Sequence, residues 1–127
     1  MCDFFLKTNF DIQGPIYKQI MDTIKIKIAT EEYPLGSKIL SVRDFAELFG
    51  VNPNTVQKAL SKLEDANLLY SEGTSGRFVT TDKDILASLK KELPKKIIKN
   101  FIVEMSELGI CHSKLSELIE NYREEKL

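Results

Sequence analysis

Apolar residues recur at every fourth position early in the chain, and this spacing predicts the first helix. The repeat consists of Ile16, Ile20, Ile24 and Ile28. It follows Gly14-Pro15, a pair that suits the start of a helix because proline is well tolerated in the first helical turn. We expect an amphipathic helix of about 14 residues, ended by the Tyr-Pro-Leu-Gly break at residues 33–36.

Two further helices are predicted downstream, separated by a short turn. Ser41 followed by Asp44 is a capping-box pattern, and Gly50 is placed to end the helix that it starts. Asn52 and Pro53 then suit the cap and first position of a longer helix. Its apolar face consists of Val56, Ala59, Leu60 and Leu63. A short helix, a turn and a longer helix form a helix-turn-helix, whose second helix can enter a major groove.

A β-hairpin is predicted directly after the helix-turn-helix. Asn67 is placed to end the longer helix in a left-handed conformation, which asparagine tolerates. The β-rich runs Leu68–Tyr70 and Phe78–Thr80 then flank the glycine-containing tip 73–76. A hairpin after a helix-turn-helix is the layout of a winged helix. We assign residues 1–81 to this DNA-binding domain.

Residues 82–127 show helical spacing alone and predict a C-terminal helical segment. Pro94 is expected to kink or split the first helix, and Gly109 to end it. Two helices cannot bury both of their apolar stripes in each other, so we expect a homodimer. The predicted interface comprises Leu93, Ile97, Phe101, Met105, Leu108, Leu115, Leu118, Ile119 and Tyr122. The fold class is mainly α with a small β-wing: an N-terminal winged helix-turn-helix and a C-terminal two-helix dimerisation segment.

Composition is that of a globular protein but gives no global sign of nucleic-acid binding. Hydrophobic residues make up 43% and charged residues 29%, and no apolar run is long enough to span a bilayer. The net charge is −1, whereas nucleic-acid-binding domains are often basic. Any DNA-binding surface must therefore arise from the local placement of basic groups, whose effect is screened over about 8 Å.

The N-terminal residues lack the pattern of a secretory signal, and we expect a cytoplasmic protein. Phe4, Leu6 and Phe10 predict a short strand before the first helix. Cys2 and Cys111 lie far apart without metal-ligand spacing and are interpreted as free thiols in a reducing compartment.

Catalytic and cofactor motifs are not found. His112 adjoins Cys111, but a zinc site needs three or four ligands and none is spaced to help. There is no glycine-rich phosphate loop and no nucleophile elbow. We therefore expect no metal, no cofactor and no enzymatic activity.

The outward face of the second helix of the motif carries the functional signal. It presents Asn54, Thr55, Gln57, Lys58, Ser61 and Lys62. Asparagine and glutamine can pair with adenine, while threonine and lysine suit phosphates or guanine. The alternative is an ordinary solvated face, but no acidic residue precedes Glu64 on this helix. A winged helix used for protein–protein contact is a second alternative, which predicts apolar anchors that this face lacks.

Neighbouring residues are expected to extend the same surface. Lys38 and Arg43 would flank the groove, although Arg43 could instead pair with Asp44 or Glu47 nearby in sequence. Gly76 and Arg77 at the hairpin tip are candidates for a minor-groove contact, where a missing side chain permits close approach.

At these residues the chain resembles the GntR family of bacterial repressors. The resemblance covers residues 10–80 and is carried by VNPNTVQKAL, supported by PIYKQI before it and by the glycine-tipped wing. The tail, ending LGICHSKLSELIENY, is similar to the two-helix dimerisation module of the YtrA subfamily. The resemblance implies a homodimer that binds a palindromic operator on double-stranded DNA, usually as a repressor. It carries the family's DNA contacts onto Arg43, Asn54, Thr55, Gln57, Lys58 and Gly76.

Three positions depart from the family pattern. Ile39-Leu40-Ser41 stands where Leu-Pro-Ser is common, and Asn67 replaces the usual glycine after the recognition helix. The wing lacks the family's lysine but contains Arg77. The change in the wing bears on its contact with the minor groove and leaves the expected fold unchanged. The operator sequence, the regulated genes, the effector and the sign of regulation are not encoded in a recognisable pattern.

Overall fold

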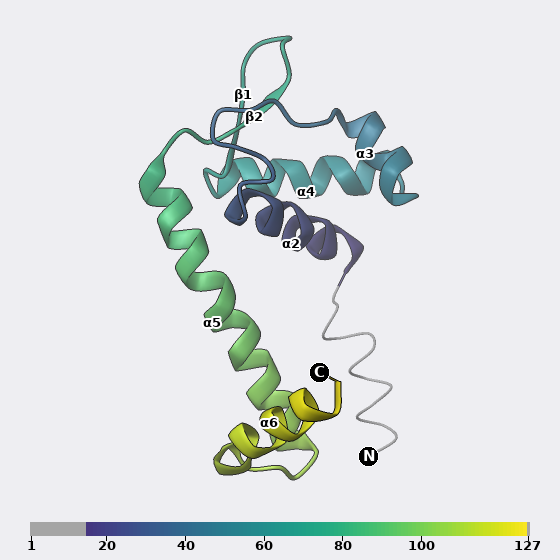
Figure 1. Ribbon diagram of the computed structural model, residues 1–127. Coiled ribbons are helices and arrows are strands. Elements are labelled where there is room, and N and C mark those ends of the chain that lie inside the picture. Colours follow the sequence, from purple (N-terminus) through teal and green to yellow (C-terminus); the bar gives the residue numbers. More distant parts are fainter. Residues whose placement is uncertain (1–14, 127) are drawn as a thin grey trace. The chain divides into compact units, whose positions relative to one another are not determined.

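The computed structural model describes residues 15–126, which form two compact units (Figure 1). One unit contains residues 15–93 and the other contains residues 94–126. The strand predicted around Phe4, Leu6 and Phe10 lies outside the described residues. No helix among the described residues is long and apolar enough to cross a membrane.

The first helix has the predicted length and buried face. Helix α2 (Ile16–Ala29) has 14 residues. Its repeat buries Ile20, Ile24 and Ile28 in the core, whereas Ile16 in the first turn stays exposed. The isoleucine spacing therefore places one apolar stripe against the helices that follow.

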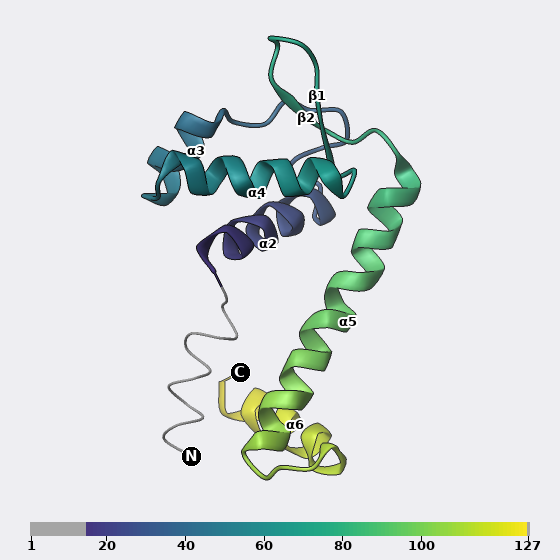
Figure 2. The same cartoon turned by 180° about the vertical axis from the view of Figure 1, so that it is seen from behind.

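Helices α3 (Val42–Phe49) and α4 (Pro53–Asp65) form the predicted helix-turn-helix, with α2 and α3 packed on α4 (Figures 1 and 2). The predicted caps are confirmed: the Ser41 side chain accepts a hydrogen bond from the backbone N–H of Asp44, and the side-chain oxygen Oδ1 of Asn52 accepts one from the backbone N–H of Asn54. Gly50 ends α3 in the left-handed region, with φ of 66°.

The predicted apolar face of α4 is also confirmed. All four of its members are buried, and the core is completed by Phe45 from α3 and by leucines of the wing and of the next helix. Because one side of α4 is wholly buried, the opposite side of the helix is free to face a ligand. Asn67 follows α4 with φ of 64°, as predicted for its terminating residue.

The wing is an antiparallel hairpin of β1 (Leu69–Ser71) and β2 (Arg77–Val79), in which Tyr70 pairs with Phe78. Each strand is displaced by one residue from its predicted bounds. The predicted end residues still pair, since the Thr80 N–H donates to the Leu68 carbonyl at 2.9 Å.

A further segment pairs with β2 on its other side. The Val79 N–H donates to the Ser37 carbonyl at 2.8 Å, and the Ile39 N–H donates to the Arg77 carbonyl at 3.0 Å. Lys38 forms an isolated antiparallel bridge with Phe78. The connection between α2 and α3 is thus part of the wing, which the break at residues 33–36 did not suggest.

Helix α5 (Lys83–Glu107) continues through Pro94, so of the two predicted outcomes, a kink or a split, the split is wrong. Pro94 has no N–H to donate to the backbone carbonyl of Lys90, one turn earlier. The residues around Pro94 are exposed, so water can donate a hydrogen bond to this carbonyl instead. The first part of α5 packs with the winged helix: Leu86 and Leu89 are buried in its core and Leu93 is half-buried against it. The domain boundary predicted between residues 81 and 82 therefore precedes the first three turns of α5, which pack with the winged unit.

The second unit consists of the remainder of α5, the short 3₁₀ helix η1 (His112–Lys114) and α6 (Leu115–Lys126). Gly109 ends α5 with φ of 80°, and the Ile110 N–H donates back to the Met105 carbonyl, a pattern typical of a helix C-terminus. Leu115 is buried. Most other large apolar side chains of this unit remain exposed.

Candidate DNA-binding surface

The outward face of α4 has the composition predicted from the sequence. Asn54, Gln57, Lys58 and Lys62 are exposed, and Thr55 and Ser61 are half-buried. These residues share a helix whose opposite face is wholly buried, so the structure brings all six together on one rigid element. Helical side chains held in this way can be inserted into a major groove.

Two lysines of this face gather over one aromatic ring of α2. The ammonium nitrogen of Lys58 lies 4.1 Å from the centroid of the Tyr17 ring, and that of Lys62 lies 5.7 Å from it. The negative face of an aromatic ring attracts a cation. Tyr17 therefore acts as a platform that orients two positive charges beside the polar face of α4.

Tyr17 was not among the residues predicted from the sequence. It stands beside the isoleucine stripe of α2 and is half-buried against the core, which the sequence pattern indicated. Its contact with Lys58 depends on the packing of α2 against α4, and neither helix alone predicts it.

Gln57 and Ser61 are linked along the outward face of α4. The Gln57 amide donates to the Ser61 hydroxyl at 3.1 Å, one turn further along. This hydrogen bond is exposed and joins two neutral groups. Replacing it with a hydrogen bond to a base edge therefore costs little free energy. The amide is thereby held against the helix surface in the absence of DNA.

Arg77, predicted to reach the minor groove, has another role in the structure. Its Nε donates to the Glu64 carboxylate at 2.5 Å, and its side chain is 19% exposed. The Ser71 hydroxyl donates to the same carboxylate oxygen. Arg77 therefore ties the wing to the end of α4, and the expected placement of its guanidinium at the wing tip is corrected.

The Glu64 carboxylate is stabilised in its charged form. The hydrogen bond from Ser71 and the bond and charge of Arg77 together hold the pKa of Glu64 below its ordinary value, against the opposing effect of partial burial. The first acidic residue of α4 is thus neutralised locally by the wing, which limits its repulsion of a phosphate backbone.

Lys38 and Gly76 lie together at the base of the wing tip. Gly76 has φ of 119°, and a Cβ added there would come within 3.0 Å of the Lys38 side chain. The backbone conformation therefore favours glycine at this position, and an added Cβ would require the end of the Lys38 side chain to shift by a few tenths of an ångström. Lys38 remains exposed beside it, and the pair offers a positive charge next to an unobstructed backbone.

Arg43 is exposed on the first turn of α3. Within residues 15–126 it forms no ion pair with Asp44 or Glu47, which were the alternative partners suggested by the sequence. Its guanidinium is therefore available to a ligand.

No group of three or more His, Cys, Asp or Glu side chains in the described part of the chain could hold a metal ion. Cys111 is exposed, and its sulfur lies 3.0 Å from the Ser113 hydroxyl in the turn between α5 and α6.

Comparison with known sequences identifies the N-terminal region. The pattern described as bacterial regulatory proteins, gntR family, matches residues 16–79. The chain is 31% identical over 119 residues to the HTH-type transcriptional regulator YhcF of Bacillus subtilis, covering 94% of this chain and 98% of that protein. It is also 31% identical over 106 residues to the HTH-type transcriptional repressor YtrA of Bacillus subtilis, covering 83% and 82% of the two chains.

Solved structures agree with this assignment. A GntR family transcriptional regulator from Listeria monocytogenes superimposes with a TM-score of 0.75 and 39% identity, covering 88% of this chain and 98% of that one. The DNA-binding domain of AraR, solved in complex with an operator, superimposes with a TM-score of 0.54 and 30% identity over 56% of this chain and 86% of that one. Relatives on this fold are named as regulators of transcription, not as enzymes. The chain belongs to the GntR family of bacterial regulatory proteins and is a DNA-binding transcriptional regulator.

Proposed function

We propose that this regulator binds a palindromic operator as a homodimer and represses transcription. The observation that carries the proposal is the outward face of α4, which presents amide, hydroxyl and ammonium groups and no acid before Glu64. Base edges in the major groove are read by such groups. The DNA-binding domain of AraR, which shares this fold and was solved in complex with an operator, supports the same ligand class.

Each part of the surface has a distinct role in the proposed complex. Gln57 and Asn54 read base edges, while Thr55, Lys58 and Lys62 contact phosphates or guanine. Arg43 binds the backbone flanking the groove. Lys38 and the backbone at Gly76 approach the adjacent minor groove, which is the role first assigned to Arg77.

Operator selection from random DNA with the full chain tests the proposed reading. We expect enriched sequences to contain two inverted half-sites spaced by about one helical turn. Gln57→Ala should relax the preference at one position in each half-site and cost about 1–3 kcal/mol of binding free energy. Arg43→Ala should weaken binding at least about tenfold without changing the melting temperature. The variant loses a charged contact with a phosphate but loses no ion pair within the protein.

The matched control is Lys91→Ala, which removes a positive charge from the exposed side of α5, away from α3 and α4. It should leave operator affinity within about twofold, because a surface charge away from the contact contributes little. If the selection enriches no sequence, or if Gln57→Ala leaves both preference and affinity unchanged, α4 is not the reading helix.

The homodimer is proposed from the apolar surface of the second unit. Residues predicted for the interface that remain exposed are Ile97, Leu108, Leu118, Ile119 and Tyr122, and Ile98 and Ile102 add to them. Phe101 and Met105 are half-buried. Leu115 is covered within the unit and Leu93 belongs to the winged core, so the proposal no longer depends on either. An exposed apolar surface of this kind marks an interaction site, and a two-fold axis would pair it with its own copy.

Sedimentation velocity tests the dimer. The full chain should sediment as a dimer at micromolar concentration, and the double variant Ile97→Lys/Ile119→Lys as a monomer. Val103→Lys is the control: Val103 is 48% exposed and lies on the opposite side of α5 from Phe101, so this variant should remain dimeric. A monomeric wild type would contradict the homodimer and with it the inverted half-sites.

Repression is the proposed result of binding to an operator within a promoter. The name of the relative YtrA, a transcriptional repressor, supports it. A dimer that occupies a promoter excludes polymerase, and linking two half-sites raises affinity by about 10²–10⁴ over one. Such a protein acts in the cytoplasm, where the chromosome lies. A reporter gene placed behind the selected operator should fall in expression when the chain is produced; a rise would identify an activator.

A further inference from the structure

The polar face of α4 divides into two lines of side chains. The members of the first line follow one another at spacings of three and four residues, so they share one side of the helix. They are Asn54, Gln57 and Ser61. Lys58 and Lys62 form the second line, and both of their ammonium groups lie over the Tyr17 ring of α2. The charged groups of this face are thus drawn towards α2, and the line that contains Gln57 is neutral.

One hydrogen bond within the neutral line fixes the Gln57 amide. Its Nε2 donates to the Ser61 hydroxyl at 3.1 Å. The next polar group along this side of the helix, the Glu64 carboxylate, is already bonded by Ser71 and Arg77, so it does not compete with Ser61 for the amide. Gln57 is exposed and Ser61 is half-buried. The amide is therefore tethered through its nitrogen while its side chain stays accessible to a ligand.

The hydrogen-bonding groups left on the tethered amide match one base. A glutamine amide carries two N–H donors and one carbonyl acceptor. With one N–H bonded to Ser61, one donor and one acceptor are left side by side. Adenine presents an acceptor at N7 and a donor at N6 in the major groove, whereas guanine presents two acceptors, N7 and O6. The carbonyl oxygen of Gln57 would therefore face a donor on adenine and a second acceptor on guanine.

We propose that Ser61 is a positioning residue that makes Gln57 select adenine over guanine at one position of each half-site. The N–H on the side away from Oε1 stays bonded to Ser61. The N–H beside Oε1 donates to adenine N7, and Oε1 accepts from adenine N6. Because the amide is oriented before DNA binds, less side-chain entropy is lost in the complex. This role of Ser61 rests on the reading function proposed for α4, but its hydrogen bond belongs to the free protein and can be measured without DNA.

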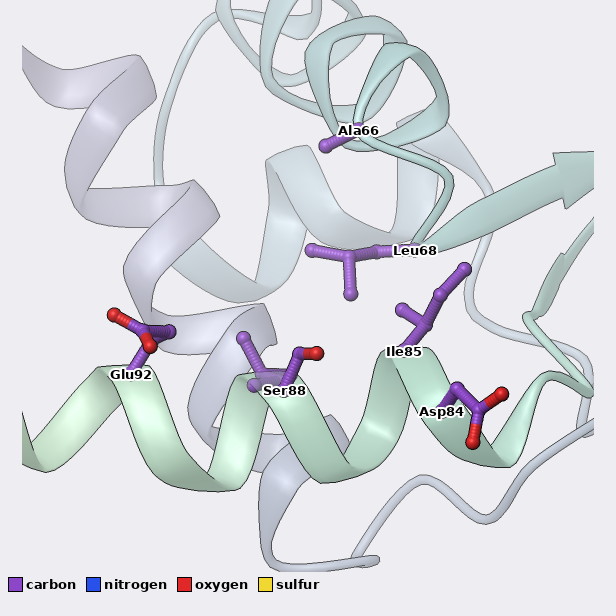
Figure 3. A pocket seen from close by; sticks show the side chains of 7 residues that line it. Ala66, Leu68, Asp84, Ile85, Ser88 and Glu92 are labelled. Atoms are coloured by element: carbon purple, nitrogen blue, oxygen red, sulfur yellow. The ribbon is translucent and has the colours of Figure 1, made fainter.

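The side-chain amide resonances of Gln57 in the free, full chain test the hydrogen bond. Ser61→Ala should shift them, and Ser61→Thr, which restores a hydroxyl, should return them towards the wild-type positions. Ser88→Ala is the matched control and should leave them unchanged. It removes an exposed hydroxyl from α5, where Ser88 lines a surface depression with Leu68 and Ile85, outside the polar face of α4 (Figure 3). Unchanged resonances in Ser61→Ala would overturn the proposal.

Operator selection with the wild type and with Gln57→Ala identifies the base position that depends on Gln57, where we expect adenine. At this position Ser61→Ala should reduce the ratio of the affinities for adenine and guanine operators about twofold to tenfold, the effect of one net hydrogen bond. Ser61→Thr should restore the ratio, and Ser88→Ala should keep it. Replacing the adenine with 7-deazaadenine, which lacks the N7 acceptor, should weaken binding of the wild type by a similar factor and leave Gln57→Ala unaffected.

Failure of this proposal can be told apart from failure of the proposed function. A Gln57-dependent position that prefers guanine, or at which Ser61→Ala discriminates as the wild type does, would overturn the role of Ser61 and leave α4 as the reading helix. A loss of discrimination that Ser61→Thr does not restore, or that Ser88→Ala shares, would do the same. A selection that enriches no Gln57-dependent base would overturn both.

Discussion

Glu64 at the end of α4 and Arg77 at the start of β2 form an ion pair of 2.5 Å that joins α4 to the wing. They are thirteen positions apart along the chain, so the pair forms only when the hairpin has closed in the observed register. Ser71 on the facing strand donates to the same carboxylate. Both strands are thus fixed to α4 through one acidic side chain.

Glu64→Gln should lower the free energy of unfolding by about 1 kcal/mol, because a partly exposed charged hydrogen bond is replaced by a neutral one. The pKa of Glu64 is lower in the folded chain than its ordinary value of about 4.3. A lowered pKa stabilises the fold above the unfolded value, and this contribution is lost as pH falls through the folded value.

The difference in melting temperature between wild type and Glu64→Gln should therefore be constant above about pH 5 and shrink below pH 4. Glu72→Gln changes an exposed wing residue whose side chain forms no hydrogen bond or ion pair within residues 15–126; it is the control and should match the wild type. A difference that persists unchanged into acid would exclude the ion pair as its source.

Tyr17→Leu should weaken binding to all DNA sequences about twofold to fivefold, because Lys58 loses the ring that orients it. Lys58→Ala should weaken it further and flatten the slope of affinity against salt by about one unit. In the double variant the two losses should be less than additive, since both act through one ammonium group.

Filter binding across a salt series measures this coupling. Lys91→Ala on the exposed side of α5 is the control for charge and should leave the salt slope unaltered. Strictly additive losses would mean that Tyr17 and Lys58 act independently.

Gly76→Ala should destabilise the wing by about 1–3 kcal/mol, since alanine is strained at φ of 119° and its methyl group would meet Lys38. Gly73→Ala is matched to it: φ is 54° there, but nothing lies within 4 Å of an added Cβ. We expect the smaller loss from Gly73→Ala in both thermal stability and operator affinity. Equal losses would show that the contact with Lys38 has no effect.

A chain ending at Leu93 should fold, whereas one ending at Asp82 should be strongly destabilised. The shorter chain loses the burial of Leu86 and Leu89, about 1.5–3 kcal/mol each, from a total stability of about 5–15 kcal/mol for a typical domain. Circular dichroism melts of the two chains distinguish these outcomes. A shorter chain as stable as the longer one would place α5 outside the winged core.

Local signals in the sequence predicted most of the winged unit. Ser41, Gly50, Asn52 and Asn67 each lie where their backbone preferences indicated, because caps and left-handed positions depend on residues close in sequence. The buried face of α4 followed from helical spacing in the same way. The polar face of α4, with six of the candidate residues, needed no more information than this.

Contacts between distant segments were not predictable in this way. Arg77 was assigned to DNA because arginine near a wing tip suits a groove, but the hairpin register brings it to Glu64. The segment containing Lys38 joins β2 only through long-range backbone pairing. The continuation of α5 past Pro94 depends on exposure of the carbonyl one turn earlier, which spacing alone does not reveal.

Backbone hydrogen bonds anchor residues 37–39 to β2. We therefore expect the wing to accept inserted residues only at the far end of the hairpin. There, residues 72–75 are exposed, and the Glu72 and Gly76 backbones close the turn between themselves. Insertions at residues 37–39 would break bonds on which the wing depends, whereas insertions at 73–75 would lengthen the tip and leave the paired strands in place. Divergence among regulators built on this plan can therefore alter the reach of the wing independently of α4, the helix proposed to read the bases.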